Sequence, residues 1–525
     1  MPLGKVVIGQ SGGPTAVINK SLVGFVKEAT KSNFDEILGA KHGLEGMLNE
    51  DFVDLANLSE AQLYGIGKTP AAALGSVRKK PTDSDIEKLI SIFEKQNIRN
   101  FFYIGGNDSA ETANLVAEGA SSIGYEMKAF HIPKTIDNDL LETDHCPGYG
   151  SAARFVAHAF QGDDADNRSL KGIKINVLMG RHAGWLTAAS TLGKSTEEDG
   201  PHLVYVPEKV FKIEEFLKEV KEVYDSLGRC VVAVSEGIHN EEGEYFLQTY
   251  ASETGSGLAG KTDSHGNIQL SGSGALGDTL TNIVSEHFDS ARVRADTFGY
   301  LQRSFLADIS DVDAEEAERV GQHAVAASQE LQSGSIVLKR QLSETYFCDV
   351  DVVELNKVAK HTKDMPQDFL DEAKPYVTNN FFYSEYIEAY KDRIFEIQQL
   401  LGKWGPLDIL IYDWEGDPNN NREMFLKTRQ ERAAKAYELQ LISNPETWVD
   451  NEMKRYDEIV SNNGWPFGSA DAPMGMRKQI GSIYKNNYIE YIEMWSNQSG
   501  LTVDDLIQSE DFHCCLLYTS DAADE

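Results

Sequence analysis

Two aspartates separated by one residue carry the strongest chemical signal in this sequence. Asp137 and Asp139 follow the apolar run 128–133, and Lys134 lies between that run and the two carboxylates. Two neighbouring carboxylates beside a cation can provide a general base and a metal site. An Asx turn without a chemical role is the alternative. The density of reactive side chains in so short a segment favours the site.

A glycine-rich turn follows the apolar run 5–9. Gly12 and Gly13 lack side chains, so backbone N–H groups could approach a phosphate closely, and a helix expected to begin near Thr15 would add its dipole. A plain turn between a strand and a helix is equally compatible with these residues. The turn matches neither the Walker A loop nor the GxGxxG fingerprint.

Polar residues follow the apolar run 100–106 in the same way. Asn107, Asp108 and Ser109 open a predicted helix. They could cap that helix, or they could contact a phosphate or Mg²⁺, for which oxygen ligands are suited.

Two further apolar runs, 173–180 and 230–237, end in charged residues. Arg181 could hold phosphate oxygens bidentately, and Glu236 could accept hydrogen bonds from a sugar hydroxyl. Each could equally be a solvated loop side chain. We expect the neighbouring His182 to be structural.

The elements that must position these residues alternate along the chain. The short apolar runs are separated by amphipathic stretches at 84–96, 110–119 and 213–228. This alternation predicts βαβ units and a parallel sheet covered on both faces. Ligands of such sheets bind at the carboxyl ends of the strands, where all of these candidates lie. Glycines, cations and carboxylates gathered there are what phosphoryl transfer requires.

Composition limits the other possibilities. The chain has 525 residues, 41% of them apolar, and a formal net charge of −34. This length is typical of about three domains, and so acidic a surface disfavours nucleic-acid binding. The five cysteines show no metal-ligand or disulfide spacing, and no apolar run reaches the roughly 18 residues of a membrane span. We therefore expect no membrane association and a cytoplasmic protein.

The sequence changes character after about residue 375. Five of the six tryptophans lie there, and mixed-charge stretches predict a mostly helical segment over 375–514 of unknown role. Residues 515–525 resemble the translation of a sequencing-library adapter, with an ordinary acidic tail as the alternative. We expect the native C-terminus to be missing and exclude this tail from the fold.

Seven segments together resemble the phosphofructokinase family, in the family's order and over roughly residues 1–345. They are Ser11-Gly-Gly-Pro14, Leu74-Gly-Ser-Val-Arg78, Gly105-Gly-Asn-Asp-Ser109, Pro133-Lys-Thr-Ile-Asp-Asn-Asp139, Met179-Gly-Arg181, Ser235-Glu-Gly237 and Arg294-Ala-Asp-Thr-Phe-Gly-Tyr-Leu-Gln-Arg303. The resemblance implies an α/β fold of two similar three-layer parallel-sheet domains with the site between them. Residues 1–148, with part of 275–300, would bind the phosphoryl donor, and residues 149–345 the sugar phosphate.

The resemblance also implies a role for each residue. Asp137 would take the proton from the 1-hydroxyl of fructose 6-phosphate, and Arg181 would hold the migrating phosphoryl group. The sugar would be bound by Thr135, Met179, Gly180 and Glu236, and its 6-phosphate by Arg294, Tyr300 and Arg303. The donor would be bound by Gly12, Gly13, Arg78 and Ser109. Mg²⁺ would be bound by Asn107, Asp108 and Asp139. Arg294 would reach in from a neighbouring subunit of a homo-oligomer, a dimer or a tetramer.

Two positions address the donor. ATP-dependent members resemble Gly-Gly-Asp-Gly-Ser and Pro-Gly-Thr-Ile-Asp-Asn-Asp, whereas here Asp108 and Lys134 replace glycines. A carboxylate at 108 adds bulk and charge near an ATP α-phosphate, and Lys134 offers a cation to a small, highly charged donor. Both changes resemble the pyrophosphate-dependent branch, whose reaction is reversible in principle.

Two departures and two alternatives accompany this interpretation. Asn107 stands where many members carry an Mg²⁺-associated aspartate, and Tyr300 where a histidine is common. The alternatives are an ATP-dependent enzyme, which Asp108 and Lys134 oppose, and a non-catalytic sugar-phosphate-binding homologue. The latter would be expected to lose Asp137 or Arg181.

Overall fold

The computed structural model describes residues 4–194, 198–254, 274–288, 291–340 and 348–370, with short helical pieces at 449–450 and 453–454. The chain divides into two compact units, Met1–Glu396 and Ile397–Glu525. The predicted helical segment 375–514 and the tail 515–525 lie outside the described residues, apart from those two pieces. The fold below is that of the first unit.

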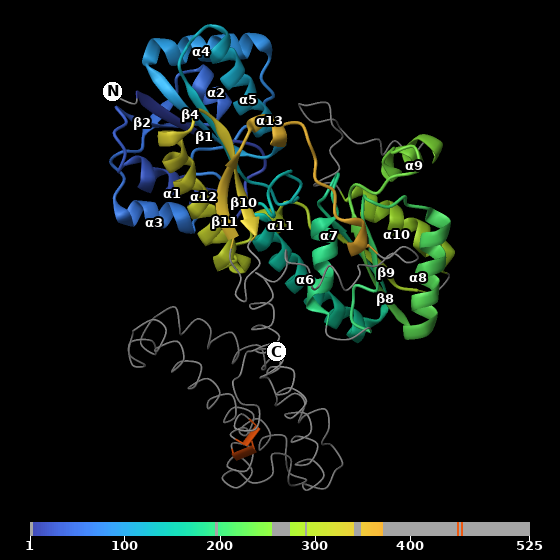
Figure 1. The fold of residues 1–525 in the computed structure, drawn as a ribbon. Helices are drawn as coiled ribbons and strands as arrows, with labels where there is room; N and C mark the ends of the chain where they lie inside the picture. Colours follow the sequence, from blue (N-terminus) through green and yellow to red (C-terminus); the bar gives the residue numbers. More distant parts are fainter. Residues whose placement is uncertain are drawn as a thin grey trace. The chain divides into compact units, whose positions relative to one another are not determined.

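The first lobe is built on a sheet in which seven described strands follow the order β11-β10-β5-β4-β1-β2-β3 (Figure 1). The inner pairs are parallel, whereas β3 and β11 run antiparallel at the two edges. The strands are β1 Lys5–Gln10, β2 Ile37–Ala40, β3 Phe52–Asp54, β4 Ile98–Gly105, β5 Lys128–Pro133, β10 Gly334–Arg340 and β11 Cys348–Val353.

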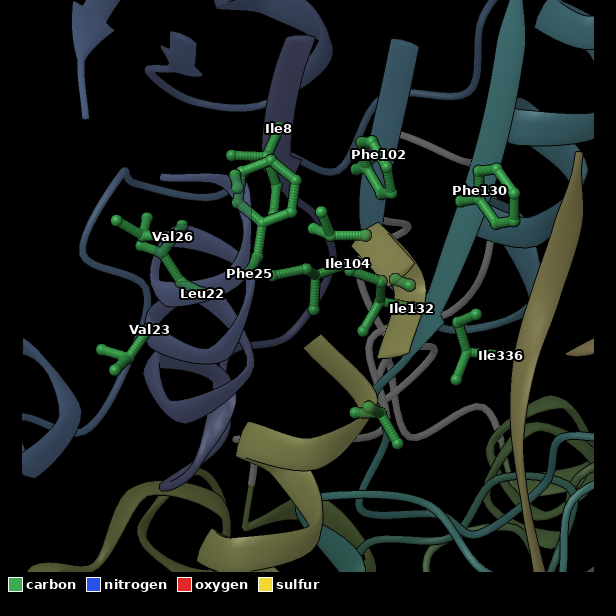
Figure 2. Packing of buried hydrophobic residues seen from close by; sticks show 14 of the residues in the cluster. Ile8, Leu22, Val23, Phe25, Val26, Phe102, Ile104, Phe130, Ile132 and Ile336 are labelled. Carbon is green, nitrogen blue, oxygen red and sulfur yellow. The ribbon is translucent and has the colours of Figure 1, made fainter. Parts of the chain in front are cut away.

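Alternate side chains of these strands enter two different cores. Val6 and Ile8 pack with α1 and α12 on one face, and Val7 packs with α2, α4 and α5 on the other. In the first core, the rings of Phe25 and Phe102 lie 4.9 Å apart, and Figure 2 shows Phe25 reaching from α1 toward the strands. The helices of this lobe are α1 Ile18–Ala29, α2 Leu44–Leu48, α3 Glu60–Lys68, α4 Asp83–Gln96, α5 Asn107–Ser122, α12 Asp311–Glu330 and α13 Leu355–Val358.

Helices α1 and α12 approach each other closely because both carry a glycine at the contact. A Cβ atom on Gly24 would lie 1.9 Å from the carbonyl oxygen of Glu318, and one on Gly321 would lie 2.1 Å from that of Ser21. Any side chain there would force the helices apart and open the first core. Although α12 comes late in the sequence, it is therefore an integral part of the first lobe.

The second lobe is built on four described parallel strands in the order β7-β8-β6-β9. Its strands are β6 Gly172–Leu178, β7 Leu203–Tyr205, β8 Arg229–Ser235 and β9 Val293–Thr297. One face packs against α6 and α7 and the other against α8 and α10. The helices are α6 Tyr149–Leu170, α7 Trp185–Ala189, α8 Ile213–Leu227, α9 Phe246–Thr254, α10 Ala275–His287 and α11 Leu301–Ser304.

Local sequence signals mark several helix ends. Thr82 and Asp85 form a capping box at the start of α4, and Gly228 ends α8 with a left-handed φ of 68°. The helix expected near Thr15 begins instead at Ile18, so the glycine-rich turn is followed by a longer connection. Across the described residues, no helix is long and apolar enough to cross a membrane.

The predicted α/β class is confirmed, but the structure divides the chain differently from the expected domains. Residues 275–300 contain α10 and β9, and β9 pairs with β6 in the second sheet, not the first. Residues 311–340 return to the first lobe, where β10 pairs with β5. The motifs follow one another along the chain, and their order does not reveal where the chain crosses between the two sheets.

Candidate active site

Three of the predicted segments meet because their strands are neighbours. β1, β4 and β5 lie side by side and parallel, so the turns that leave them share one edge of the sheet. These turns carry Gly12 and Gly13 after β1, Asn107 after β4, and 134–139 after β5.

Lys134 ties two of these turns together. Its side chain is buried, and its Nζ donates a hydrogen bond to the Gly13 carbonyl oxygen at 2.8 Å. A Cβ atom on Gly12, whose φ is 75°, would lie 3.1 Å from the same Nζ. The Gly12 N–H donates to the Val77 carbonyl oxygen at 3.0 Å, so this amide is paired within the protein.

Two arginines join Lys134 at the glycine turn. A Cβ atom on Gly13 would lie 2.8 Å from an Arg303 nitrogen and 3.4 Å from an Arg78 nitrogen, so both guanidinium groups reach this turn. Burial and the charge of Arg78 lower the pKa of Arg303, whose guanidinium lies 4.3 Å from the Tyr300 ring centre. Three cations gathered at one turn create a positive local potential, the kind of environment that attracts a highly charged anion.

The charges around Lys134 act on its own proton as well. Burial, together with the charges of Arg303 and Arg78, lowers the pKa of Lys134 to about 8, while Asp137 and Asp139 oppose the shift. The amine can therefore change its charge near neutral pH, in contrast to an exposed lysine.

The two aspartates differ in their environments. Burial raises the pKa of Asp137, and the charges of Lys134, Arg181, Arg78 and Arg303 oppose that rise. Burial, together with the neighbouring charge of Asp137, raises the pKa of Asp139 to about 6. The Asp137 N–H donates to Thr135 Oγ1 at 3.0 Å. Asp137 thus lies within reach of the cations of both lobes.

Asn107 presents an oxygen that the described protein does not satisfy. Its Nδ2 donates to Asp139 Oδ2 at 3.1 Å, whereas its Oδ1 is buried without a hydrogen-bond partner among the described residues. The cap of α5 is Gly106, so Asn107 is not used as a cap, and the exposed Asp108 lies in the first helical turn. A buried unpaired oxygen beside a carboxylate fits a hard cation such as Mg²⁺.

A second cluster of metal-ligand types lies nearby but is already paired. Atoms of Asp144, His145 and Cys348 lie within 4.8 Å of one another. His145 Nδ1 lies 2.9 Å from an Asp144 oxygen, and its Nε2 lies 2.5 Å from a Glu316 oxygen. Both imidazole nitrogens are thus occupied. The described cysteines, Cys146, Cys230 and Cys348, are buried and free of disulfides.

The predicted residues of the second lobe lie at the ends of β6 and β8. Ser235 Oγ donates to the Gly180 carbonyl oxygen at 2.6 Å. A Cβ atom on Gly237 would lie 2.1 Å from the Arg181 carbonyl oxygen, so the two turns touch. Glu236 is buried, and Met179 is held by a 3.3 Å hydrogen bond from its N–H to Gln302 Oε1.

Of the other predicted phosphate contacts, Arg294 lies apart from this cluster, whereas Tyr300 adjoins it through Arg303. Arg294 is exposed on the edge strand β9, and its guanidinium donates to the Val293 carbonyl oxygen at 2.7 Å. The Tyr300 side chain is 49% exposed, and the Arg303 guanidinium lies over its ring. Arg303 itself, expected at the sugar phosphate, lies at Gly13 together with Arg78.

Sequence reasoning missed two neighbours of the site, Tyr245 and Lys363, and assigned a third, His182, only a structural role. Burial raises the pKa of Tyr245, with Arg181 lowering it and Glu236 raising it, so this phenol lies among the second-lobe residues. Burial lowers the pKa of His182, and the nearby charge of Asp139 opposes this shift. The Lys363 N–H donates to the Asp139 carbonyl oxygen at 2.8 Å. None of the three belongs to a recognisable motif, and Lys363 lies beyond the segment that the motifs cover.

The two α/β lobes gather glycines, cations and paired carboxylates at their strand ends, which are the groups that phosphoryl transfer requires. The family model for phosphofructokinase matches residues 5–328, more than half of the chain. The chain therefore belongs to the phosphofructokinase family, as the motifs predicted.

Similar proteins with known names support this membership. A protein of Rhodospirillum rubrum named pyrophosphate–fructose 6-phosphate 1-phosphotransferase is 48% identical over 380 residues, which cover 72% of this chain and 92% of that protein. A Xanthomonas campestris protein of the same name is 35% identical and covers 70% of this chain and 88% of its own length. The solved pyrophosphate-dependent phosphofructokinase of Nitrosospira multiformis is 32% identical, with a TM-score of 0.63, and covers 74% of this chain and 92% of its own.

Proposed function

We propose that this protein transfers a phosphoryl group from pyrophosphate to the 1-hydroxyl of fructose 6-phosphate, giving fructose 1,6-bisphosphate and phosphate. The observation that carries the proposal is the buried amine of Lys134, 2.8 Å from the Gly13 carbonyl oxygen and beside Arg78 and Arg303. A compact cluster of three cations matches a compact polyanion. The names of the relatives support the same donor and acceptor.

Asp108 favours pyrophosphate over ATP. Its exposed carboxylate lies in the first turn of α5, next to the Asn107 that faces Asp139. A nucleotide donor would have to bring its α-phosphate and sugar past this negative charge, whereas pyrophosphate ends before them. Repulsion between like charges in a partly desolvated site costs binding free energy.

Asp137 is the base in this proposal. Its carboxylate accepts the proton of the sugar 1-hydroxyl as that oxygen attacks a phosphorus atom of pyrophosphate. A new O–P bond forms, the bridging P–O bond breaks, and phosphate leaves. The cations around Asp137 favour its ionised form, and Arg181 stabilises the transferred group. The donor pyrophosphate is a phosphate anhydride and the product fructose 1,6-bisphosphate is a phosphate ester, and both are small anions. The reaction can therefore run in reverse.

In this proposal Mg²⁺ would be held by oxygens of Asn107, Asp108 and Asp139, and the buried, unpaired Asn107 Oδ1 is the observation that supports it. When bound there, the ion would neutralise charge on the donor phosphates. Asn107 also fixes one oxygen of Asp139 through its 3.1 Å hydrogen bond, which orients that carboxylate.

The second lobe supplies the sugar site in this proposal. The buried Glu236 and the backbone around Met179 and Gly180 line it, and Thr135 faces it from the first lobe. Arg294, exposed on an edge strand, is available to a second copy of the chain, as expected of a homo-oligomer.

The test is a pair of assays on the purified protein. Fructose 6-phosphate, pyrophosphate and Mg²⁺ should yield fructose 1,6-bisphosphate, measured through an aldolase-coupled reaction. Fructose 1,6-bisphosphate and phosphate should yield pyrophosphate in the opposite direction. Sedoheptulose 7-phosphate, a close analogue, serves as a second acceptor. Absence of turnover in both directions with both sugars would contradict the proposal.

A further inference from the structure

A segment near the end of the first unit passes from one lobe to the other (Figure 1). After β11, the short helix α13 packs against α5, and Val358 and Ala359 are buried in the first lobe. Further on, Met365, Phe369 and Leu370 are buried in the core of the second lobe. We call residues 359–370 the crossing segment.

The far end of the crossing segment is firmly attached to the second lobe. The Phe369 ring meets the Trp185 ring edge-on, with centres 6.0 Å apart. The Met365 N–H donates to Glu208 Oε1 at 3.1 Å, and the same oxygen accepts the Gly184 N–H at 2.8 Å. One partly buried carboxylate thus joins the crossing segment to the turn before α7.

Lys363 lies at the midpoint, beside the loop that carries the two aspartates. Its N–H donates to the Asp139 carbonyl oxygen at 2.8 Å. Its Nζ donates to the carbonyl oxygens of Asp144 at 2.8 Å and Thr143 at 3.1 Å, with a longer 3.5 Å contact to Asn138 Oδ1. Four bonds from one residue therefore fix both ends of the loop 138–144.

The conformation of Asn138 explains why these bonds bear on the carboxylates. Asn138 separates Asp137 from Asp139 and is left-handed, with a φ of 56°. Its Oδ1 accepts the Cys146 N–H at 3.1 Å as well as the contact from Lys363. A left-handed residue costs conformational free energy and persists where its surroundings hold it. The directions of Asp137 and Asp139 follow from this conformation.

The ammonium also faces the second lobe. Its Nζ lies 5.2 Å from the centre of the Trp185 ring, the distance of a cation–π contact. Burial lowers the pKa of Lys363, while Cys146, Asp144 and Asp139 raise it and favour the charged amine. Its hydrogen bonds in one lobe and its ring contact in the other make it a link between the two.

We propose that Lys363 is a positioning residue for the reaction: it holds the Asp137–Asp139 loop in its productive conformation and couples that loop to the second lobe. The proposal rests on the proposed function for the role of Asp137. It differs from that function in naming a residue that is assigned no substrate contact and that lies outside every motif of the sequence.

The test compares Lys363→Met with Lys360→Met in the full chain. Lys360 lies on the same segment, but its exposed side chain pairs only at 3.4 Å with Glu111. Lys363→Met should lower kcat by about tenfold or more, because small displacements of a base are costly, with KM for both substrates changed less than about threefold. Lys360→Met should retain the wild-type kcat.

Amide hydrogen exchange tests the same claim with a readout that does not depend on measuring activity. Peptides covering 135–146 should exchange about tenfold faster or more in Lys363→Met than in the wild type. In Lys360→Met, their exchange rate should equal that of the wild type. Equal exchange and equal kcat in the two variants would overturn the proposal, as would a lower melting temperature with wild-type kcat per folded molecule. If Lys363→Met does not fold, Lys363→Gln replaces it in both measurements. A wild type without turnover would contradict the proposed function, and the exchange result would still decide whether Lys363 holds the loop.

Discussion

The Nζ of Lys134 donates a hydrogen bond to the carbonyl oxygen of Gly13 at 2.8 Å, which ties the loop after β5 to the turn after β1. Gly13 matches its sequence motif, whereas Lys134 departs from the motif of the ATP-dependent members. The two motifs lie over a hundred residues apart. The bond holds a buried cation at the turn where Arg78 and Arg303 also arrive. It gives a structural reason for a lysine where ATP-dependent relatives are expected to carry glycine.

Removing that cation should selectively impair use of the donor. Lys134→Met keeps the aliphatic volume but loses the charge, so kcat/KM for pyrophosphate should fall by about ten- to a hundredfold, the cost of one charge-assisted hydrogen bond. KM for fructose 6-phosphate should stay within about threefold. Initial rates with each substrate varied in turn make the measurement. An equal loss for both substrates would show a general distortion instead.

The pH dependence of donor use follows from the same amine. Because the pKa of Lys134 is lowered to about 8, the amine is protonated below that pH and loses its charge above it. We expect kcat/KM for pyrophosphate to decline as the pH rises through about 8. Dividing the wild-type profile by that of Lys134→Met removes the ionisation of pyrophosphate itself. A flat ratio would contradict a role for this proton.

Asp108 should act as a barrier to nucleotides. Asp108→Gly removes the carboxylate from the first turn of α5, where it is exposed and buries little area. We expect measurable turnover with ATP, without a large change in stability, because the repulsion toward the α-phosphate is lost. Asp108→Asn, which removes the charge but keeps the bulk, separates the two effects. Undetectable ATP use in both variants would mean that other residues exclude the nucleotide.

Asp137 should be essential for turnover and dispensable for binding. Asp137→Asn keeps the size of the side chain but cannot accept the proton, so kcat should fall by about a hundred- to ten-thousandfold. Calorimetric titration with fructose 6-phosphate should give an affinity close to that of the wild type. Unchanged turnover would remove Asp137 from its proposed role.

Truncation should separate the catalytic core from the rest of the chain. Ending the chain after Pro375 retains the crossing segment, so we expect a folded, cooperatively melting core. Ending it after Ala359 removes Met365, Phe369 and Leu370 from the second core, and each buried apolar side chain contributes about 2–5 kcal/mol. That shorter chain should melt at a much lower temperature or aggregate. Circular dichroism melts of the two make the comparison, and aggregation of the longer one would contradict it.

Much of the strand and helix order could be predicted because the buried strands are short and wholly apolar. The predicted run at 128–133 coincides with β5, and the stretch at 84–96 differs from α4 by one residue. What the pattern could not give is the pairing of β10 with β5, which depends on contacts about 200 residues apart. The antiparallel pairing of the edge strands β3 and β11 could not be predicted either, because it depends on the path of the segments that connect them to their partner strands.

The site could be predicted in part because strand ends of a parallel sheet converge. Lys134, Arg78 and Gly13 come together as neighbours on the basis of motif and sheet alone. Arg303 was expected at the sugar 6-phosphate, and its approach to Gly13 could not be predicted, because a motif fixes the residue but not the reach of a long side chain. Lys363 lies in no motif, since its role depends on backbone carbonyls that carry no sequence signature.

The most direct test of the account is a comparison of initial rates with pyrophosphate and with ATP, at equal concentrations, with fructose 6-phosphate and Mg²⁺. We predict turnover with pyrophosphate and none, or far less, with ATP, and loss of that turnover when the metal is chelated. Turnover with ATP alone would leave the fold and Asp137 in place but contradict the assignment of Asp108 and Lys134.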